Sequence, residues 1–541
     1  MTPPARTDRA ADRDRAADRD QLAGRRWDWV VVGAGSCGAV VAERLSAAGD
    51  AAVLLLEAGP NVRAGDAPPE MRRGHWSAIL DLDRFPQFQW PGLTARRTPH
   101  RPPAHYWRGR GMGGSSSING QVAIRPPLDE FARWGTTDAT LWSEPAALAG
   151  FVELEDDLAY PDAPYHGTGG PIPISRAPVD TWGDLDLAFR AALEDQGHRF
   201  EPDANRPGAS GISIFPYNAR GEERVGTNEA YLEPARDRPN LTIVGDCLVD
   251  RVRFQNGRAA GVRCLVGGRP LAVDAGGVVL AAGAVHSPAI LLRSGVGPAG
   301  ALAALGVPVV ADLAVGQRLQ EHPHVYFGFP VNAGLRGPAN GRHTNACVRW
   351  TSGLAGTAAD DMMGIVNGPS PGAPELAGLG LWVNQAEARG RLTLATTDPT
   401  VDPDLQLNLA GDDRDLRRLA DCVAVAAELL DHPAFRRLRR GPVVGPDGGA
   451  LPEAGDRKAV TQWVRDTVDV AAHVSATCPI GRPADGGVVD SAGAVHGLAS
   501  LWVVDLSIAP SAPRANTNLT AIMLAGRLAG KLATDSASLT H

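Results

Sequence analysis

Lysine is almost absent from this 541-residue chain. Only Lys458 and Lys531 are lysines, so 51 of the 53 basic residues are arginine. Neither lysine follows the glycine spacing of a Walker A phosphate loop. One lies in a charged stretch and the other near the C-terminus, so neither suits a Schiff base. The sequence therefore argues against P-loop nucleotide hydrolysis and against pyridoxal-phosphate chemistry.

Closely spaced cysteines, an excess of positive charge and long apolar runs are also missing. The six cysteines contain no C-x-x-C pair, which predicts reduced thiols, no metal site and a cytoplasmic location. The net charge of −8 argues against a nucleic-acid partner. No apolar stretch is long enough to span a membrane, and no signal-peptide core follows the N-terminus.

The first 26 residues differ in composition from the rest of the chain. The sequence RAADRD occurs twice in succession at residues 9–20, with alternating charge and almost no apolar side chains. A segment of this kind has little to bury, so residues 1–26 are predicted to form a disordered tail.

A dinucleotide-binding pattern follows the tail directly. Residues 29–32 predict a buried strand, residues 39–48 a helix, and residues 52–56 a second strand that ends in Glu57. Between the first strand and the helix lie Gly33, Ala34, Gly35, Ser36, Cys37 and Gly38. The three glycines suit a tight turn, a close backbone approach to a pyrophosphate and helix–strand packing, while the acidic residue suits a ribose. This unit alone does not distinguish NAD from FAD.

A second glycine-rich segment lies further along the chain. Residues 60–108 show little periodicity and are interpreted as a long excursion without regular structure. The loop at residues 109–120 then combines glycines, three serines and Asn119, which leaves its backbone bare. A flat ring system or a phosphate could approach such a loop closely.

The remaining regular elements are predicted from periodicity and composition. Helices are expected at 180–196, 416–430 and 521–533, and strands at 241–244, 278–283 and 501–504. A further helix is expected to begin at Pro288, because proline suits the first turn of a helix.

Six motifs in this order resemble those of the glucose–methanol–choline (GMC) oxidoreductases, a family of FAD-dependent alcohol oxidases and dehydrogenases. They are the turn at 33–38 with Glu57, the loops at 109–120 and 283–297, GQRLQEHP at 316–323, HVSATCPIG at 473–481 and NTN at 516–518. The resemblance extends from about Trp27 to the C-terminus.

The resemblance implies a mixed α/β fold, in which a Rossmann-like FAD domain is interleaved with a substrate domain built on an antiparallel sheet. The FAD domain would comprise residues 27–150, 226–319 and 476–541. The substrate domain would comprise residues 151–225 and 320–475. Pocket residues are expected from the segments at 76–107 and 325–331.

The resemblance also implies which residues contact FAD. The expected set is Gly33, Gly35, Ser36, Gly38, Glu57, Met112, Gly114, Ser115, Asn119, Gly120, Val122, Val249, Asp505 and Leu506. Some family members attach the flavin through a histidine, but Ile118 occupies that position here. Isoleucine has no nucleophile, so FAD is expected to bind non-covalently.

Alcohol oxidation removes a hydroxyl proton and a carbon-bound hydride. Flavin N5 can accept the hydride, and a histidine is suited to accept the proton. By the resemblance His473 is the expected base, with Asn518 hydrogen-bonded to the substrate oxygen. Asn516, Thr517 and Asn518 also precede an apolar helix, so residues of this triplet could cap it. His322 is interpreted as a structural hydrogen-bonding residue.

Two other functions remain open on the sequence. An NAD-dependent dehydrogenase would explain the first glycine motif but not the loop at 109–120. A flavin-containing relative with a lyase or non-redox role would keep every cofactor motif. On the favoured interpretation the substrate is a small alcohol, and the electron acceptor is oxygen or another oxidant.

Overall fold

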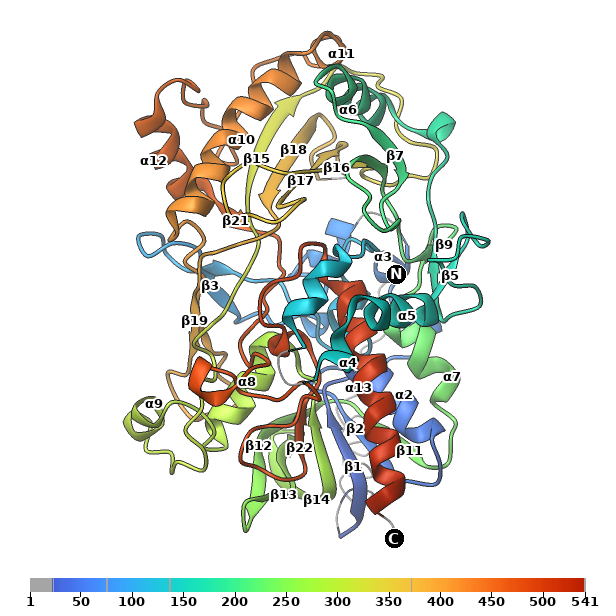
Figure 1. Ribbon diagram of the computed structural model, residues 1–541, viewed down its shortest axis with the longest axis vertical. Coiled ribbons are helices and arrows are strands. Elements are labelled where there is room, and N and C mark those ends of the chain that lie inside the picture. The colour runs from blue at the N-terminus through green and yellow to red at the C-terminus, as the bar shows by residue number, and fades with distance from the viewer. Residues whose placement is uncertain (1–21, 23, 74–75, 136–137, 371, 540–541) are drawn as a thin grey trace.

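The computed structural model describes residues 22, 24–73, 76–135, 138–370 and 372–539. It has a mixed α/β fold in which two large sheets lie toward opposite ends of the long axis (Figure 1). Most of the predicted tail falls outside the described residues. Of its last residues, Leu22 is buried, and the first strand already begins at Arg26.

The first large sheet combines a parallel half with an antiparallel meander. Five strands run parallel, in the order β11 (Leu241–Val244), β2 (Val53–Leu56), β1 (Arg26–Val32), β14 (Arg269–Leu280) and β22 (Leu501–Val503). The antiparallel strands β12 (Cys247–Gln255) and β13 (Arg258–Val266) extend the sheet from the first half of β14.

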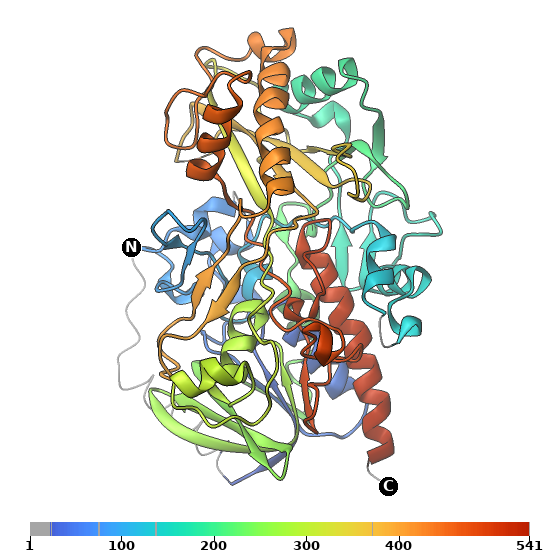
Figure 2. The same ribbon diagram turned by 60° about the vertical axis from the view of Figure 1, so that its left-hand side comes forward.

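The parallel strands are short runs of Val and Leu because helices cover the sheet. Val30, Val31 and Leu54 have no exposed surface. The helices α2 (Gly38–Ala47) and α13 (Thr517–Leu539) pack against one another beside this sheet, although they come from opposite ends of the chain (Figures 1 and 2). The carboxyl ends of the parallel strands meet at one edge, where doubly wound folds bind their ligands.

The second large sheet is antiparallel apart from one pair of strands. Its order is β21 (Asp469–Val470), β15 (Pro323–Pro330), β18 (Leu376–Val383), β17 (Met362–Asn367), β16 (Ala346–Trp350), β8 (Gly211–Ile214) and β7 (Phe200–Asp203). Helices α6 (Asp184–Asp195) and α10 (Asp413–Asp431) pack against one face, and α11 (Pro433–Arg436) and α12 (Arg457–Thr467) pack against these helices. Division of the chain into domains at the expected bounds stays a prediction.

Smaller elements complete the described chain. A four-stranded sheet joins β3 (Thr94–Arg96) and β4 (Ala104–His105) to β19 (Arg391–Thr393) and β20 (Asp404–Gln406). The other elements are α3 (Pro69–Arg72), α4 (Ala139–Trp142), α5 (Glu144–Leu154), α7 (Glu233–Ala235), α8 (Gly283–Arg293), α9 (Ala299–Ala304), β5 (Glu155–Asp157), β6 (Ile172–Ile174), β9 (Ala219–Arg220) and β10 (Glu223–Arg224). Across the residues that are described, no helix is long and apolar enough to cross a membrane.

Two predicted segments differ from the structure. The excursion at residues 60–108 contains α3, β3 and β4, so it is not wholly irregular. Helix α8 begins at Gly283 and contains Pro288, which was expected to start it. Proline cannot donate to the carbonyl of Ala284 one turn earlier, and the Thr477 hydroxyl donates to that oxygen at 2.8 Å instead. The side chain of a distant segment therefore allows the helix to start early.

Candidate active site

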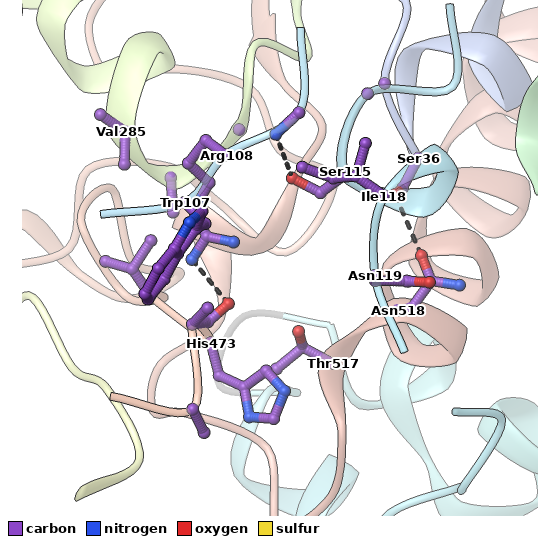
Figure 3. Close-up of a pocket in the computed structure, with 18 of the residues that line it drawn as sticks. Ser36, Trp107, Arg108, Ser115, Ile118, Asn119, Val285, His473, Thr517 and Asn518 are labelled. Atoms are coloured by element: carbon purple, nitrogen blue, oxygen red, sulfur yellow. Dashed lines mark hydrogen bonds between the residues drawn. The ribbon is translucent and has the colours of Figure 1, made fainter. Parts of the chain in front are cut away.

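One cavity of about 730 Å³ is lined by residues of both large sheets. One part of its wall comes from the turns that follow β1, β2 and β14, at the carboxyl edge of the parallel strands. Another part comes from β15, β17 and β18 of the antiparallel sheet. Figure 3 shows side chains from distant segments facing this space.

The two glycine-rich segments contact each other across the top of the first sheet. The amide of Gly113 donates to the carbonyl of Ala34 at 2.8 Å. A Cβ atom on Gly114 would lie 2.7 Å from the Cα of Gly35, so the two backbones touch. A Cβ on Gly35 itself would meet nothing nearer than 3.8 Å. The resulting wall is bare backbone, which suits a cofactor that needs close approach.

The glycines of the first turn have different structural roles. Gly33 has a φ of +96°, a left-handed conformation that favours glycine. A Cβ on Gly38 would lie 1.7 Å from the carbonyl oxygen of Gly33, which no shift of a side chain could relieve. Gly38 is therefore required by helix–strand packing, whereas Gly35 leaves space for a ligand.

Glu57 holds the loops of this wall together. Its carboxylate accepts backbone hydrogen bonds from Ala34 at 2.8 Å, Gly59 at 2.9 Å and Gly111 at 2.8 Å. The side chain lines the cavity and is only 6% exposed. Its position is compatible with the expected ribose contact, but it also ties three segments into one unit.

Most residues expected to contact the cofactor lie on the cavity wall. They are Gly33, Gly35, Ser36, Glu57, Gly114, Ser115, Asn119, Gly120, Val122, Val249, Asp505 and Leu506. Gly38 and Met112 are not among the lining residues. Met112 is buried in the hydrophobic core, and its carbonyl accepts a hydrogen bond from the Ser117 hydroxyl at 2.9 Å. Ile118 does line the cavity and offers no atom for covalent attachment (Figure 3).

His473 also lines this cavity, and backbone hydrogen bonds to a second segment fix its position. The chain at 320–322 pairs with the chain at 471–475, through Gln320 with Ser475 in both directions and through Ala471 with His322. This pairing brings the His473 and His322 rings together. Their Nδ1 atoms lie 2.9 Å apart.

The contacts of the two rings select one tautomer of His473. Its Nε2 atom lies 3.4 Å from the Nδ2 of Asn516, an amide nitrogen that can only donate. With the amide in this orientation we assign Nε2 as the acceptor and place the proton on Nδ1, which donates to His322. This assignment gives His473 an unprotonated Nε2.

Both imidazoles are held in the neutral form. Burial lowers the pKa of His322 to about 4. Burial also lowers the pKa of His473 well below its usual value, and the neighbouring His322 and the positive charge of Arg108 lower it further. A neutral histidine with an accessible lone pair is the form that a general base requires.

The sequence did not identify a buried network behind His473. The Glu321 carboxylate accepts from the backbone amides of His322 at 2.8 Å and His473 at 2.7 Å, and from the hydroxyl of Tyr106. Arg108 donates to that hydroxyl at 2.6 Å and to the carbonyl of Ala472 at 2.7 Å. The adjacent acidic and histidine residues in GQRLQEHP were the only signal that could have indicated it.

Asn518, expected beside His473, makes its hydrogen bond elsewhere on the cavity wall. Asn518 lines the cavity, but its Oδ1 accepts from the Ser36 hydroxyl at 3.1 Å, beside the first glycine turn (Figure 3). Its Nδ2 is buried without a hydrogen-bond partner, so a donor remains for a ligand at that wall. Asn516, interpreted from the sequence as a possible cap, is the residue that contacts His473.

The backbone on either side of His473 is strained. Ala472 and Ala476 both have a φ of +62°, a conformation that costs a non-glycine residue about 1–2 kcal/mol. Glycine would adopt this conformation without that cost. Such strain often accompanies a functional site.

Comparison with known proteins identifies the family. The N-terminal model of the GMC oxidoreductases matches residues 27–324, and the C-terminal model matches residues 386–525. The chain is 36% identical to 5-(hydroxymethyl)furfural oxidase of Methylovorus sp. strain MP688, over 94% of this chain and 99% of that protein. It is 30% identical to oxygen-dependent choline dehydrogenase of Vibrio vulnificus, over 93% of this chain and 94% of that protein.

A solved structure has the same fold. Pyridoxine 4-oxidase from Mesorbium loti aligns with a TM-score of 0.84 at 24% identity, covering 94% of this chain and 99% of that one. With the two family models and the curated relatives, the evidence extends over nearly the whole sequence. This chain is therefore an oxidoreductase of the GMC family, and its cofactor is FAD.

Proposed function

We propose that this enzyme oxidises an alcohol to an aldehyde or ketone, with His473 as the proton acceptor. Bound FAD supplies the acceptor for the hydride that leaves the alcohol carbon. The residues that would hold it are the bare backbone at Gly35 and Gly114, the Glu57 carboxylate and the side chain of Asn518. The observation that carries the proposal is the position of His473, whose Nε2 lies beside the Asn516 amide in the same cavity as this cofactor wall.

His473 would take the hydroxyl proton at Nε2. The ring can then become an imidazolium, with its Nδ1 proton still donated to His322. Asn516 is the better candidate for the second polar group, because its Nδ2 lies beside Nε2 and its Oδ1 is buried without a partner. An alcohol oxygen placed between these groups could accept from Asn516 and donate to His473. Asn518 is assigned instead to the cofactor wall.

The test is anaerobic stopped-flow reduction of the FAD-loaded enzyme by a reactive alcohol. Removal of a general base typically costs about 10²–10⁴-fold in rate, so we expect His473→Ala to lose flavin reduction by that factor. FAD content should stay near that of the wild type, because His473 is not among the residues that would hold FAD. Asn516→Ala should lose less, about 10-fold, because it removes a hydrogen bond rather than the base.

Two matched variants make this test specific. His432→Ala removes a histidine of the α10–α11 junction that contacts Asp195, and it should reduce flavin at the wild-type rate. Asn518→Ala should lower FAD retention more than the rate of flavin reduction. Near wild-type reduction in His473→Ala would place the base elsewhere, and His322 would be tested next. Flavin that no alcohol bleaches would favour a lyase or non-redox role.

A further inference from the structure

The antiparallel sheet presents one row of side chains to the cavity. On β15 and β17 these are His324, Tyr326, Ile365 and Asn367, and on β18 they are Gly380 and Trp382. The alternate residues, among them Val325, Phe327 and Leu381, are buried in the core on the opposite face. The sheet therefore forms the floor of the reaction end of the cavity, the part lined by the antiparallel sheet and His473. Aromatic and aliphatic side chains lie on the surface of this floor.

Two glycines of β18 shape this floor. A Cβ on Gly378 would lie 1.7 Å from the hydroxyl oxygen of Tyr326, so the tyrosine ring lies over that position. At Gly380 the nearest atoms to a Cβ would be those of Ile365, Tyr326 and Trp382, each at 3.9 Å. Glycine weakens a strand interior, and it often marks a place where a ligand approaches closely. Gly380 thus leaves a depression between three large side chains.

The register of the strands places this depression along a line from the catalytic histidine. Strand β15 begins immediately after His322, and its first residues pair with β21, which precedes His473. Trp382 pairs with His324, and Gly380 pairs with Tyr326. At about 3.4 Å per residue, these two levels lie about 7 Å and about 14 Å from His322 along the strand. A substrate that extended along β15 from the His322–His473 pair would place one aromatic ring at the Trp382 level and a second ring at Gly380.

The lining carboxylate beside this floor is already paired with a positive charge. Asp469 is the lining carboxylate nearest this floor in sequence, and its Oδ1 accepts from the buried guanidinium of Arg97 at 2.9 Å. Glu57 and Asp505 are engaged by backbone amides at the cofactor end. Arg108 lines the cavity next to Ala472, whereas Glu321 lies behind Tyr106 and is not a lining residue. In an amino alcohol such as choline, the positive charge lies two carbons from the oxygen and would be held near Arg108.

We propose, on the basis of the alcohol oxidation argued above, that the substrates are uncharged aromatic alcohols. The first ring lies along Trp382, and a substituent para to the alcohol lies in the depression over Gly380. Gly380 therefore determines the length of substrate that the cavity accepts. The relatives act on substrates as different as a furan and choline by their names, and this assignment separates the two classes for this chain.

The charge preference is tested with two alcohols of the same shape. Choline and 3,3-dimethylbutan-1-ol differ in one atom, a nitrogen cation in place of a neutral carbon. In anaerobic flavin reduction by the wild-type holoenzyme, the neutral alcohol should have at least a 10-fold higher ratio of reduction rate to Kd. Benzyl alcohol should exceed both. A preference for choline would overturn the assignment, because the aromatic walls would then act as a cation-binding cage.

The role of Gly380 is tested with benzyl alcohol and biphenyl-4-ylmethanol. Gly380→Val fills the depression, so the ratio of biphenyl to benzyl efficiency should fall at least 10-fold, mainly through Kd. Gly380→Ala should give a smaller change in the same direction, and its Cβ fits at 3.9 Å without strain. This second variant keeps the test valid if the valine variant does not fold. An equal loss for both alcohols would show that Gly380 has no part in selecting length.

The outcomes distinguish this inference from the proposed function. If no alcohol reduces the flavin, the proposed oxidation itself fails. If choline or aliphatic alcohols reduce it while aromatic alcohols do not, the oxidation stands and only the substrate class is overturned.

Discussion

The two ends of the cavity differ in the atoms that line them, which are mainly backbone at one end and side chains at the other. The cofactor end consists of backbone from the turns at Gly33, Gly35 and Gly114, fixed by the single carboxylate of Glu57. The reaction end consists of side chains from β15, β17, β18 and the segments around His473 and Asn516. A wall of bare backbone requires glycine at particular positions, so the cofactor end constrains which residues of the sequence must be glycine. The second end can vary its side chains without changing the fold, and therefore can vary its substrate.

The sharpest test of this contrast compares two glycines of one turn. Gly38→Ala places a Cβ 1.7 Å from the Gly33 carbonyl oxygen, so we expect loss of soluble, folded enzyme. Gly35→Ala meets no atom within 3.8 Å and should fold, yet its methyl group enters the space assigned to FAD. The measurements are soluble yield, apoprotein melting temperature and FAD content after gel filtration.

Gly526→Ala is the matched control for both variants. Its Cβ would meet nothing within 4 Å in helix α13, and alanine favours a helix, so yield and FAD content should be unchanged or slightly better. If Gly35→Ala retains a full complement of FAD, the bare backbone at that position is not the contact surface. The cofactor end would then depend on side chains as the reaction end does.

The contrast also explains what the sequence could predict. Strands β1, β2 and β11, helix α2 and the turn at Gly33 were all indicated, because glycine spacing and short apolar runs report backbone geometry locally. The pairing of Asn516 with His473 was not, because it depends on how residues 43 positions apart meet in space. Tyr106 and Arg108 were missed for the same reason, and the one local signal, Glu321 beside His322, does not by itself distinguish a buried network from a solvated surface.

The electrostatics of the reaction end give a smaller expected effect. Burial and the charge of Arg108 lower the pKa of His473, so the proposed base is unprotonated at neutral pH. We expect flavin reduction to be nearly independent of pH around neutrality, and to fall only below the usual histidine pKa of about 6.5. Arg108→Gln removes a positive charge, so the pKa of His473 rises and the acid limb moves to higher pH.

The measurement is the pH profile of the stopped-flow reduction rate for both proteins. His432→Ala serves again as the control and should leave the profile unchanged. An acid limb that does not move in Arg108→Gln would mean that Arg108 acts only through its hydrogen bonds to Tyr106 and Ala472. A limb already centred above pH 7 in the wild type would contradict the assignment of His473 as a buried, neutral base.

The smallest expected effect concerns strain, which the two ends handle differently. At the cofactor end the residue with a left-handed φ in the first turn is Gly33, whereas at the reaction end Ala472 and Ala476 adopt a φ of +62°. Ala472→Gly relieves about 1–2 kcal/mol of strain and loses about 0.5–1 kcal/mol to the greater entropy of the unfolded chain. For a chain of this length that net gain should raise Tm by about 1 °C.

Ala476 is fully buried, so Ala476→Gly also loses about 0.8 kcal/mol of methyl burial and should leave Tm unchanged. Calorimetry of the two variants and the wild type, at matched FAD occupancy, decides the matter. A lower Tm for Ala472→Gly would mean that its backbone carries no strain, and the difference between the two ends would then rest on their side chains alone.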